Sequence, residues 1–99
     1  MRLEIHFEAR EEFLQAAQFY EAQMPDLGQR FINEFDRCQR VLLDTPLIGQ
    51  PYGRRLRKFT VGDMFPYSIV YAPLAEVSFV LAYAHGSRRP GYWRTRSVR

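Results

Sequence analysis

The stretch FPYSIVYAPLAEVSFVLAYAH, residues 65–85, decides the fold class because it contains two strand-like segments in succession. The segments Phe65–Ala72 and Val77–His85 are rich in β-branched and aromatic residues. Only residues 73–76 separate them, which favours antiparallel pairing. Both alternating sets of side chains in Val77–His85 are apolar, so we expect a central strand that is covered on both faces.

The residues before this stretch extend the sheet. A third strand-like segment, Arg54–Val61, is followed by the turn residues Gly62-Asp63-Met64, and Leu47–Gly53 reads as a loop rich in Pro and Gly. The sequence therefore predicts a three-stranded antiparallel sheet in the second half of the chain.

The first half is mainly helical. Leu3–Phe7 alternates as a strand, whereas Glu8–Gln23 and Asp26–Leu43 carry apolar residues at helical spacing. The short link at Met24-Pro25 favours an antiparallel hairpin. The whole order predicts an α+β fold: an N-terminal strand, a two-helix antiparallel hairpin, then the three-stranded antiparallel sheet. The predicted core stripes of the helices are Ala9, Phe13, Ala16, Ala17, Tyr20 and then Leu27, Phe31, Phe35, Cys38, Leu42.

Length and composition limit the class of protein. The chain has 99 residues, which suits one domain spanning residues 1–99, and its 46% hydrophobic content is enough for a core. The lone Cys38 rules out an internal disulfide and a zinc finger. No apolar stretch reaches the ~20 residues that a membrane helix needs. We therefore expect a cytoplasmic protein with no cofactor, no metal and no membrane partner.

Charge divides the chain into two unlike halves. Residues 1–50 hold five Arg and nine acidic residues, a net charge of −4, whereas residues 51–99 hold nine Arg or Lys and two acids, a net charge of +7. This asymmetry predicts that a partner with anionic groups meets the second half.

The cations of the second half form two clusters. The first comprises Arg54, Arg55, Arg57 and Lys58, and the second interleaves arginines with aromatic rings in the tail after residue 86. Cations attract phosphates, and flat rings stack on bases. The alternative interpretation is a solvated basic edge that discourages aggregation. The predicted target-binding residues are Arg55, Arg88, Arg89, Tyr92, Trp93, Arg94 and Arg96.

His85 is a candidate general acid or base because its ordinary pKa lies near neutrality. It shares its side of the predicted strand with Phe79, Leu81 and Tyr83, so the alternative is a structural histidine at the end of a core strand. A catalytic set would comprise Arg57, Lys58, His85 and Arg88.

The segment Phe65–Tyr71, followed by Val80–His85 and by Arg88-Arg89-Pro90-Gly91-Tyr92-Trp93, resembles the C-terminal half of the RelE/ParE superfamily of type II toxin–antitoxin toxins. The helical hairpin and the connection from Pro46 to Arg55 are similar to that family as well. The resemblance implies a small growth inhibitor that a cognate antitoxin neutralises.

The resemblance also implies one of two targets, since RelE-like members cut mRNA in the ribosome and ParE-like members inhibit DNA gyrase. RelE-like ribonucleases carry an Arg after the Tyr of the third strand, where this chain has Ser68. This departure favours a ParE-like, non-catalytic inhibitor of gyrase. The alternatives are a ribosome-dependent mRNA endoribonuclease and a degenerate, non-toxic member that only binds its antitoxin.

Apolar residues at the edges of the helix stripes indicate where the antitoxin binds. We expect its apolar anchors to enter a groove between the hairpin and the sheet near Phe19, Tyr20 and Ile32.

Overall fold

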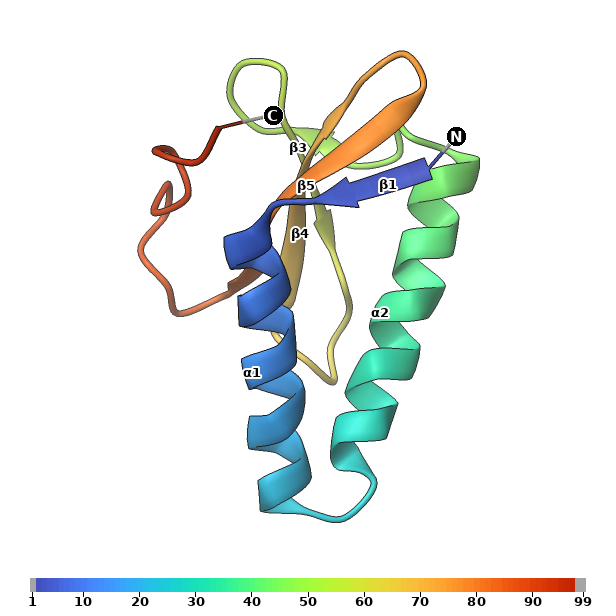
Figure 1. The fold of residues 1–99 in the computed structure, drawn as a ribbon. Coiled ribbons are helices and arrows are strands. Elements are labelled where there is room, and N and C mark those ends of the chain that lie inside the picture. Colours follow the sequence, from blue (N-terminus) through green and yellow to red (C-terminus); the bar gives the residue numbers. More distant parts are fainter. Residues whose placement is uncertain (1, 98–99) are drawn as a thin grey trace.

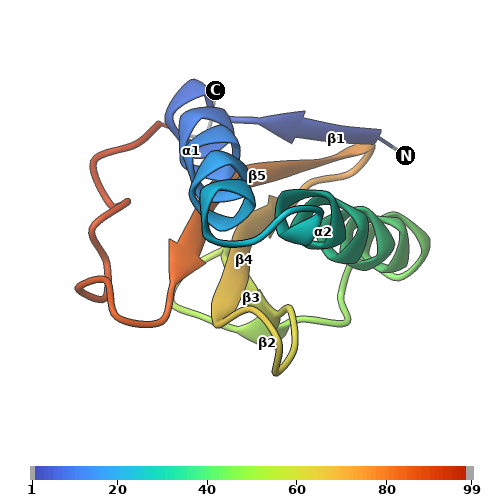
Figure 2. The same cartoon turned by 90° about the horizontal axis from the view of Figure 1, so that it is seen from below.

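A computed structural model of the chain describes residues 2–97; Met1, Val98 and Arg99 lie outside the described residues. Two helices pack on one face of a five-stranded sheet, and the tail that follows the last strand runs along the sheet's other face (Figures 1 and 2). The elements in chain order are β1 Arg2–Ile5, α1 Phe7–Gln23, α2 Leu27–Asp44, β2 Gln50–Pro51, β3 Arg57–Thr60, β4 Tyr67–Pro73 and β5 Val77–His85.

The α+β class and the three antiparallel strands of the second half are confirmed, with two additions to the sheet. Its order is β1-β5-β4-β3-β2, and β1 runs parallel to β5, with Ile5 opposite Val80. The two residues of β2 pair with β3 inside the segment that we predicted as a loop. The sheet is therefore mixed, and β5 is a central strand, as its apolar residues on both faces predicted.

Three predicted strands extended beyond the strands in the structure. The first strand ends at Ile5 because His6 caps α1, its Nδ1 accepting a hydrogen bond of 3.1 Å from the Glu8 amide. Arg54 and Arg55 lie in the loop before β3, where Arg55 has a left-handed φ of 63°. The β4 strand begins at Tyr67, two residues later than predicted.

The helix-side core is an aromatic cluster between the hairpin and the sheet. Phe31 lies at its centre, with ring centroids 4.5 Å from Phe35, 5.2 Å from Tyr20 and 5.2 Å from Phe65. Cys38 is fully buried in the same core, where burial raises the pKa of its thiol. The predicted helix stripes thus face the sheet.

A β-bulge in β5 changes which of its side chains point to each face of the sheet. Val70 is opposite Ala82 and Tyr71 is opposite Val80, so Leu81 is the extra residue. Consequently Tyr83 packs in the helix-side core while Phe79, Leu81, Ala82 and Ala84 pack in a second core on the opposite face. Our prediction that Phe79, Leu81 and Tyr83 share one side was wrong, because the bulge interrupts the alternation.

Tyr71 ties the sheet to the loop after α2. Its hydroxyl donates to the Pro46 carbonyl at 2.7 Å and accepts from the Gly49 amide at 3.0 Å. Gly49 lies so close that an added Cβ would be 2.7 Å from this hydroxyl. Tyr71 is fully buried in the helix-side core, and its hydroxyl also fixes the course of the loop.

Replacing Tyr71 by Phe is expected to lower the free energy of unfolding by about 1–3 kcal/mol, because the Gly49 amide and the Pro46 carbonyl both lose a partner. Urea denaturation followed by circular dichroism measures the change. The matched control is Tyr52→Phe, since no hydrogen bond of the Tyr52 hydroxyl occurs within residues 2–97. Equal stability of both variants would contradict the proposed role of the hydroxyl.

Candidate functional site

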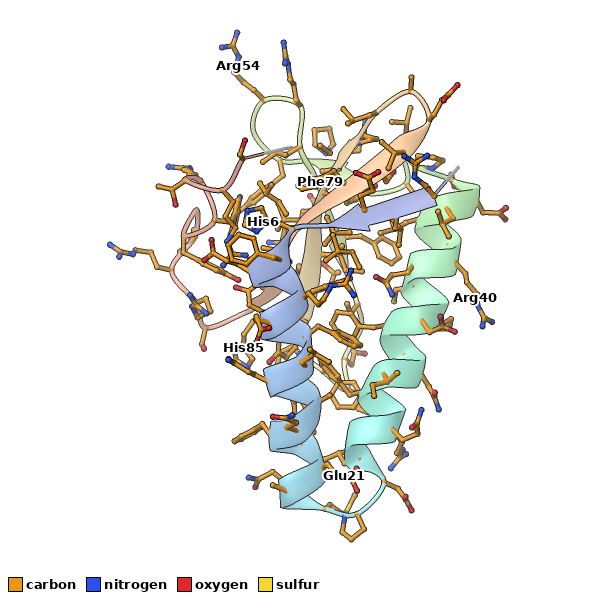
Figure 3. All side chains as sticks on the ribbon, in the orientation of Figure 1. His6, Glu21, Arg40, Arg54, Phe79 and His85 are labelled. Atoms are coloured by element: carbon orange, nitrogen blue, oxygen red, sulfur yellow. The ribbon has the colours of Figure 1, made fainter. Side chains whose placement is uncertain are left out.

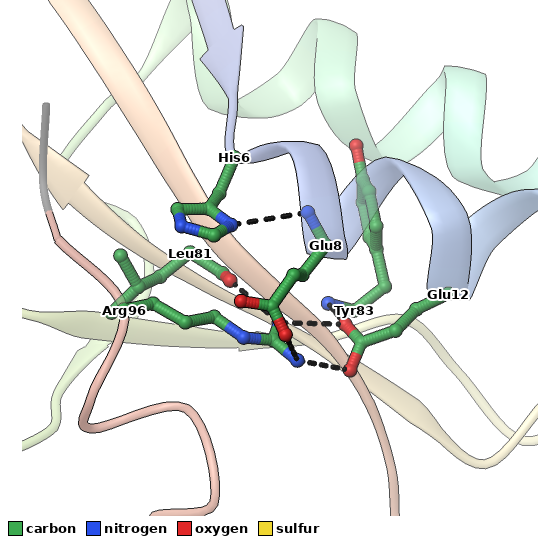
Figure 4. A network of polar contacts seen from close by, with 6 residues as sticks. All are labelled: His6, Glu8, Glu12, Leu81, Tyr83 and Arg96. Carbon is green, nitrogen blue, oxygen red and sulfur yellow. Dashed lines mark hydrogen bonds and ion pairs between the residues drawn. The ribbon is translucent and has the colours of Figure 1, made fainter.

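An ion pair between Glu12 of α1 and Arg96 of the tail joins residues 84 positions apart (Figure 4). The contact is bidentate, with N–H···O distances of 3.0 and 2.9 Å, and the side chains are only 15% and 7% exposed. We call this pair the tail clasp. Its geometry is the fork-to-carboxylate arrangement that makes arginine pairs strong.

The tail clasp also provides hydrogen-bond partners for the backbone of β5 beyond the point where β1 ends. The amide of His6 donates to the Val80 carbonyl, and β1 then turns into α1. Beyond that point the Leu81 carbonyl accepts from Arg96 at 3.0 Å, and the Tyr83 amide donates to Glu12 at 3.1 Å. Because buried backbone groups need partners, the clasp takes the place of a further β1 residue.

The electrostatics of Arg96 follow from this position. Burial lowers the pKa of its guanidinium, but the hydrogen bonds and charge of Glu12 outweigh burial and raise the pKa above its usual value. Arg96 is therefore part of the fold. The prediction that it contacts a target surface is corrected, because its side chain is enclosed between α1 and β5.

The aromatic residues of the tail pack onto the sheet. Trp93 is 5% exposed, and its ring lies 5.5 Å from Tyr52 and 5.2 Å from Tyr92. Burial raises the pKa of the Tyr92 phenol, and Glu12 raises it further. The sequence predicted both residues as exposed stacking platforms. In the structure Trp93 forms the second core with Val70 and β5, so its indole is not available to stack on a base.

A cavity of about 80 Å³ lies between this second core and the turn after β5. It brings together three of the four predicted catalytic residues, Lys58, His85 and Arg88. Ser68 of β4 also lines it, together with Tyr52, Val70, Ala84, Gly86, Pro90 and Trp93. We call it the basic cavity.

Arg57, the fourth predicted catalytic residue, does not reach the basic cavity. It lies opposite Tyr71, whose side chain is in the helix-side core, and it donates to the Gly49 carbonyl at 2.7 Å and the Leu47 carbonyl at 3.1 Å. Adjacent residues of a strand point to opposite faces, so Arg57 and Lys58 are separated by the sheet. The proposed four-residue set is corrected on this point.

His85 has a defined hydrogen-bond role at the end of β5. Its Nδ1 accepts from the Ser87 amide at 3.0 Å and lies 2.8 Å from the Ser87 hydroxyl. A ring nitrogen that accepts carries no proton, so in the neutral ring the proton is on Nε2. Its ring also packs edge-on against the Tyr67 ring, with the two ring centroids 5.1 Å apart.

Tyr67 lines a second, open hollow of about 380 Å³ on the other side of His85, along α1. Burial raises the pKa of Tyr67 to about 12, with Tyr20 and Glu12 contributing. The hollow also includes Phe19 and Arg88.

Several arginines in the second half of the chain are exposed to solvent. Arg54 extends from the loop before β3, away from the helices (Figure 3). Arg55, Arg89 and Arg94 are also exposed, and no ion pair of these four arginines occurs within residues 2–97. Arg88 is exposed as well, and its guanidinium stacks 3.9 Å above the Tyr92 ring.

The three predicted antitoxin contacts do not share one groove. Phe19 is 59% exposed beside the hollow along α1. Ile32, 37% exposed, lines a separate groove on the outer surface of the hairpin with Leu14. Tyr20 packs between Phe31 and Phe65. The structure thus separates Phe19 from Ile32, and the place where an antitoxin binds stays a prediction.

Two further properties of residues 2–97 concern metal binding and membrane insertion. No group of three His, Cys, Asp or Glu side chains within this range is arranged to hold a metal ion. None of the described helices combines the length and the apolar character that crossing a bilayer requires.

Comparison with known proteins supports the resemblance seen in the sequence. Residues 3–90 match the family model described as the ParE toxin of the type II toxin–antitoxin system, parDE. The comparison with curated proteins gives no match. Apart from Arg2 of β1, the matched region includes all the helices and strands. It also includes the basic cavity residues up to Pro90 and Glu12 of the tail clasp, whereas Arg96 lies beyond it. The chain therefore belongs to the family of ParE toxins of type II toxin–antitoxin systems.

Proposed function

We propose that this chain arrests growth by binding DNA gyrase without catalysing a reaction, and that a cognate antitoxin neutralises it. The observation that carries the proposal is the family match over residues 3–90. The family description names a ParE toxin, and the resemblance implies that ParE-like members inhibit gyrase.

The charge distribution supports binding to an anionic surface. Arg89 and Arg94 are exposed next to the basic cavity, and the second half of the chain carries a net charge of +7. Such fields steer an oppositely charged partner into contact. The proposed target-binding surface comprises Arg54, Arg55, Arg88, Arg89 and Arg94.

Binding is favoured over RNA cleavage by the composition of the basic cavity. A ribonuclease needs a group that activates the nucleophile, cations for the developing charge and an acid for the leaving oxygen. The basic cavity lacks two of the cations expected of a ribonuclease. Arg57 lies on the opposite face of the sheet, and Ser68 occupies the position at which RelE-like enzymes carry an arginine.

The antitoxin is proposed to be acidic or amphipathic and to cover Phe19 and Ile32, which are exposed apolar side chains on different faces of the hairpin. A partner that reaches both must wrap around α1. A complex in which both side chains stay exposed would contradict this arrangement.

The target is tested by expressing the chain without its antitoxin and by adding the purified chain to a gyrase supercoiling assay. We expect growth arrest with DNA-damage signalling and intact mRNA. Rapid mRNA cleavage with normal supercoiling would replace gyrase by the ribosome as the target, and no growth defect would favour a degenerate member.

Within that assay, the double variant Arg89→Ala/Arg94→Ala is expected to raise the half-inhibitory concentration by about tenfold or more, because arginines at interfaces often contribute strongly to binding. The matched control is Arg30→Ala, an exposed arginine on α2. Equal inhibition by the two variants would remove the case for the basic surface.

A further inference from the structure

The basic cavity has the size of a small oxyanion. Its volume of about 80 Å³ accommodates a few water molecules and lies well below the ~300 Å³ at which pockets for drug-sized ligands begin. This volume is closer to that of a small oxyanion than to that of a nucleoside. A single tetrahedral group fits.

The charges that line the cavity have one sign. Lys58 approaches from β3 and Arg88 from the turn after β5, and no Asp or Glu is among the lining residues. Neither cation forms an ion pair within residues 2–97. Two cations facing a confined space repel each other, so a bound anion would stabilise both.

Aromatic rings hold both cations beside the cavity. The Lys58 ammonium lies 5.1 Å from the centre of the Tyr52 ring, and the Arg88 guanidinium lies 3.9 Å from that of Tyr92. These rings restrict the two side chains before any ligand arrives. Less conformational entropy is then lost on binding.

Neutral donors complete the lining. The Ser68 hydroxyl can donate, and His85 carries its proton on Nε2 because the Ser87 amide occupies Nδ1. A phosphoryl group has several acceptor oxygens, and charge-assisted hydrogen bonds to such oxygens are strong.

We propose that the basic cavity binds one phosphoryl group, held by Lys58, Arg88, Ser68 and His85. Inorganic phosphate and the phosphodiester of a nucleic acid strand share this chemistry. In the second case the sugars and bases would lie outside the cavity, near the exposed Arg89 and Arg94. The proposal goes beyond the proposed gyrase inhibition and does not depend on it.

The test is a titration of the ¹⁵N-labelled full chain at constant ionic strength, followed by two-dimensional NMR. The probes are inorganic phosphate and a dinucleoside monophosphate, with chloride as the reference anion. We expect saturable shifts at the amides of Ser68 and Gly86 and at the Trp93 indole, which all line the cavity. Tighter binding of the dinucleotide at these residues would identify nucleic acid as the source, and binding of inorganic phosphate alone would identify the free ion.

Lys58→Met keeps the aliphatic stem and removes the charge, so it is expected to weaken phosphate binding by about tenfold or more. Arg30→Met, on exposed α2, is expected to bind as the unmodified chain does. If Lys58→Met loses its dispersed spectrum, Arg88→Met and Ser68→Ala take its place. The proposal is overturned if neither probe gives saturable shifts, or if the cavity variants and Arg30→Met bind equally well.

Discussion

Replacing Glu12 by Ala is expected to lower the free energy of unfolding by about 3–5 kcal/mol, because the buried Arg96 guanidinium loses its bidentate partner and keeps only the half-exposed Glu8 carboxylate, 3.9 Å away. It also removes the acceptor of the Tyr83 amide on the edge of β5. Urea denaturation followed by circular dichroism measures the loss. A loss of this size would make the tail clasp one of the strongest single contributions to the fold.

Two comparisons separate the clasp from surface charge effects. Arg40 and Asp36 form an ion pair on α2 with side chains 77% and 53% exposed, so Asp36→Ala is expected to cost only about 0–1 kcal/mol. Removing both partners in Glu12→Leu/Arg96→Met is expected to be less harmful than Glu12→Ala alone, since no buried charge remains and the Glu8 carboxylate is half-exposed to solvent. Equal effects of Glu12→Ala and Asp36→Ala would show that the tail is not held by the clasp.

Replacing Trp93 by Ala is expected to cost about 3–5 kcal/mol, because the indole is 5% exposed and its removal leaves a cavity in the second core. The tail would then lose its main contact with Tyr52 and the sheet. Circular dichroism is the suitable probe, since the chain has a single Trp and its fluorescence is lost with the substitution.

The neighbouring substitution Arg94→Ala is the control, because Arg94 is exposed and is expected to change stability by less than about 0.5 kcal/mol. The pair also distinguishes two roles of the tail. If Trp93→Ala abolished growth arrest while its stability stayed unchanged, the indole would act directly on a target, as the sequence first suggested. We expect instead that the loss of activity follows the loss of stability.

Much of the candidate site lay beyond the reach of sequence patterns. Glu12 is one of several acids on the polar side of α1, and nothing near it in the sequence marks it as the partner of Arg96. Tyr52 likewise carries no local signal, and Ser68 stands out only through the family resemblance, yet both line the basic cavity with His85. Lys58 and Arg57 are adjacent in the sequence, but the pleat of β3 directs them to different faces.

The sequence by itself determined the elements whose side chains repeat with a regular period. Helical spacing predicted both helices and their buried stripes, and the doubly apolar run Val77–His85 predicted the central strand, because burial of apolar surface selects these patterns locally. Tertiary structure alone decided the parallel pairing of β1, the bulge at Leu81 and the burial of Trp93 and Arg96. Each of these depends on contacts between residues far apart in the chain, and a charged or aromatic side chain has the same local signature whether it faces solvent or a partner 84 residues away.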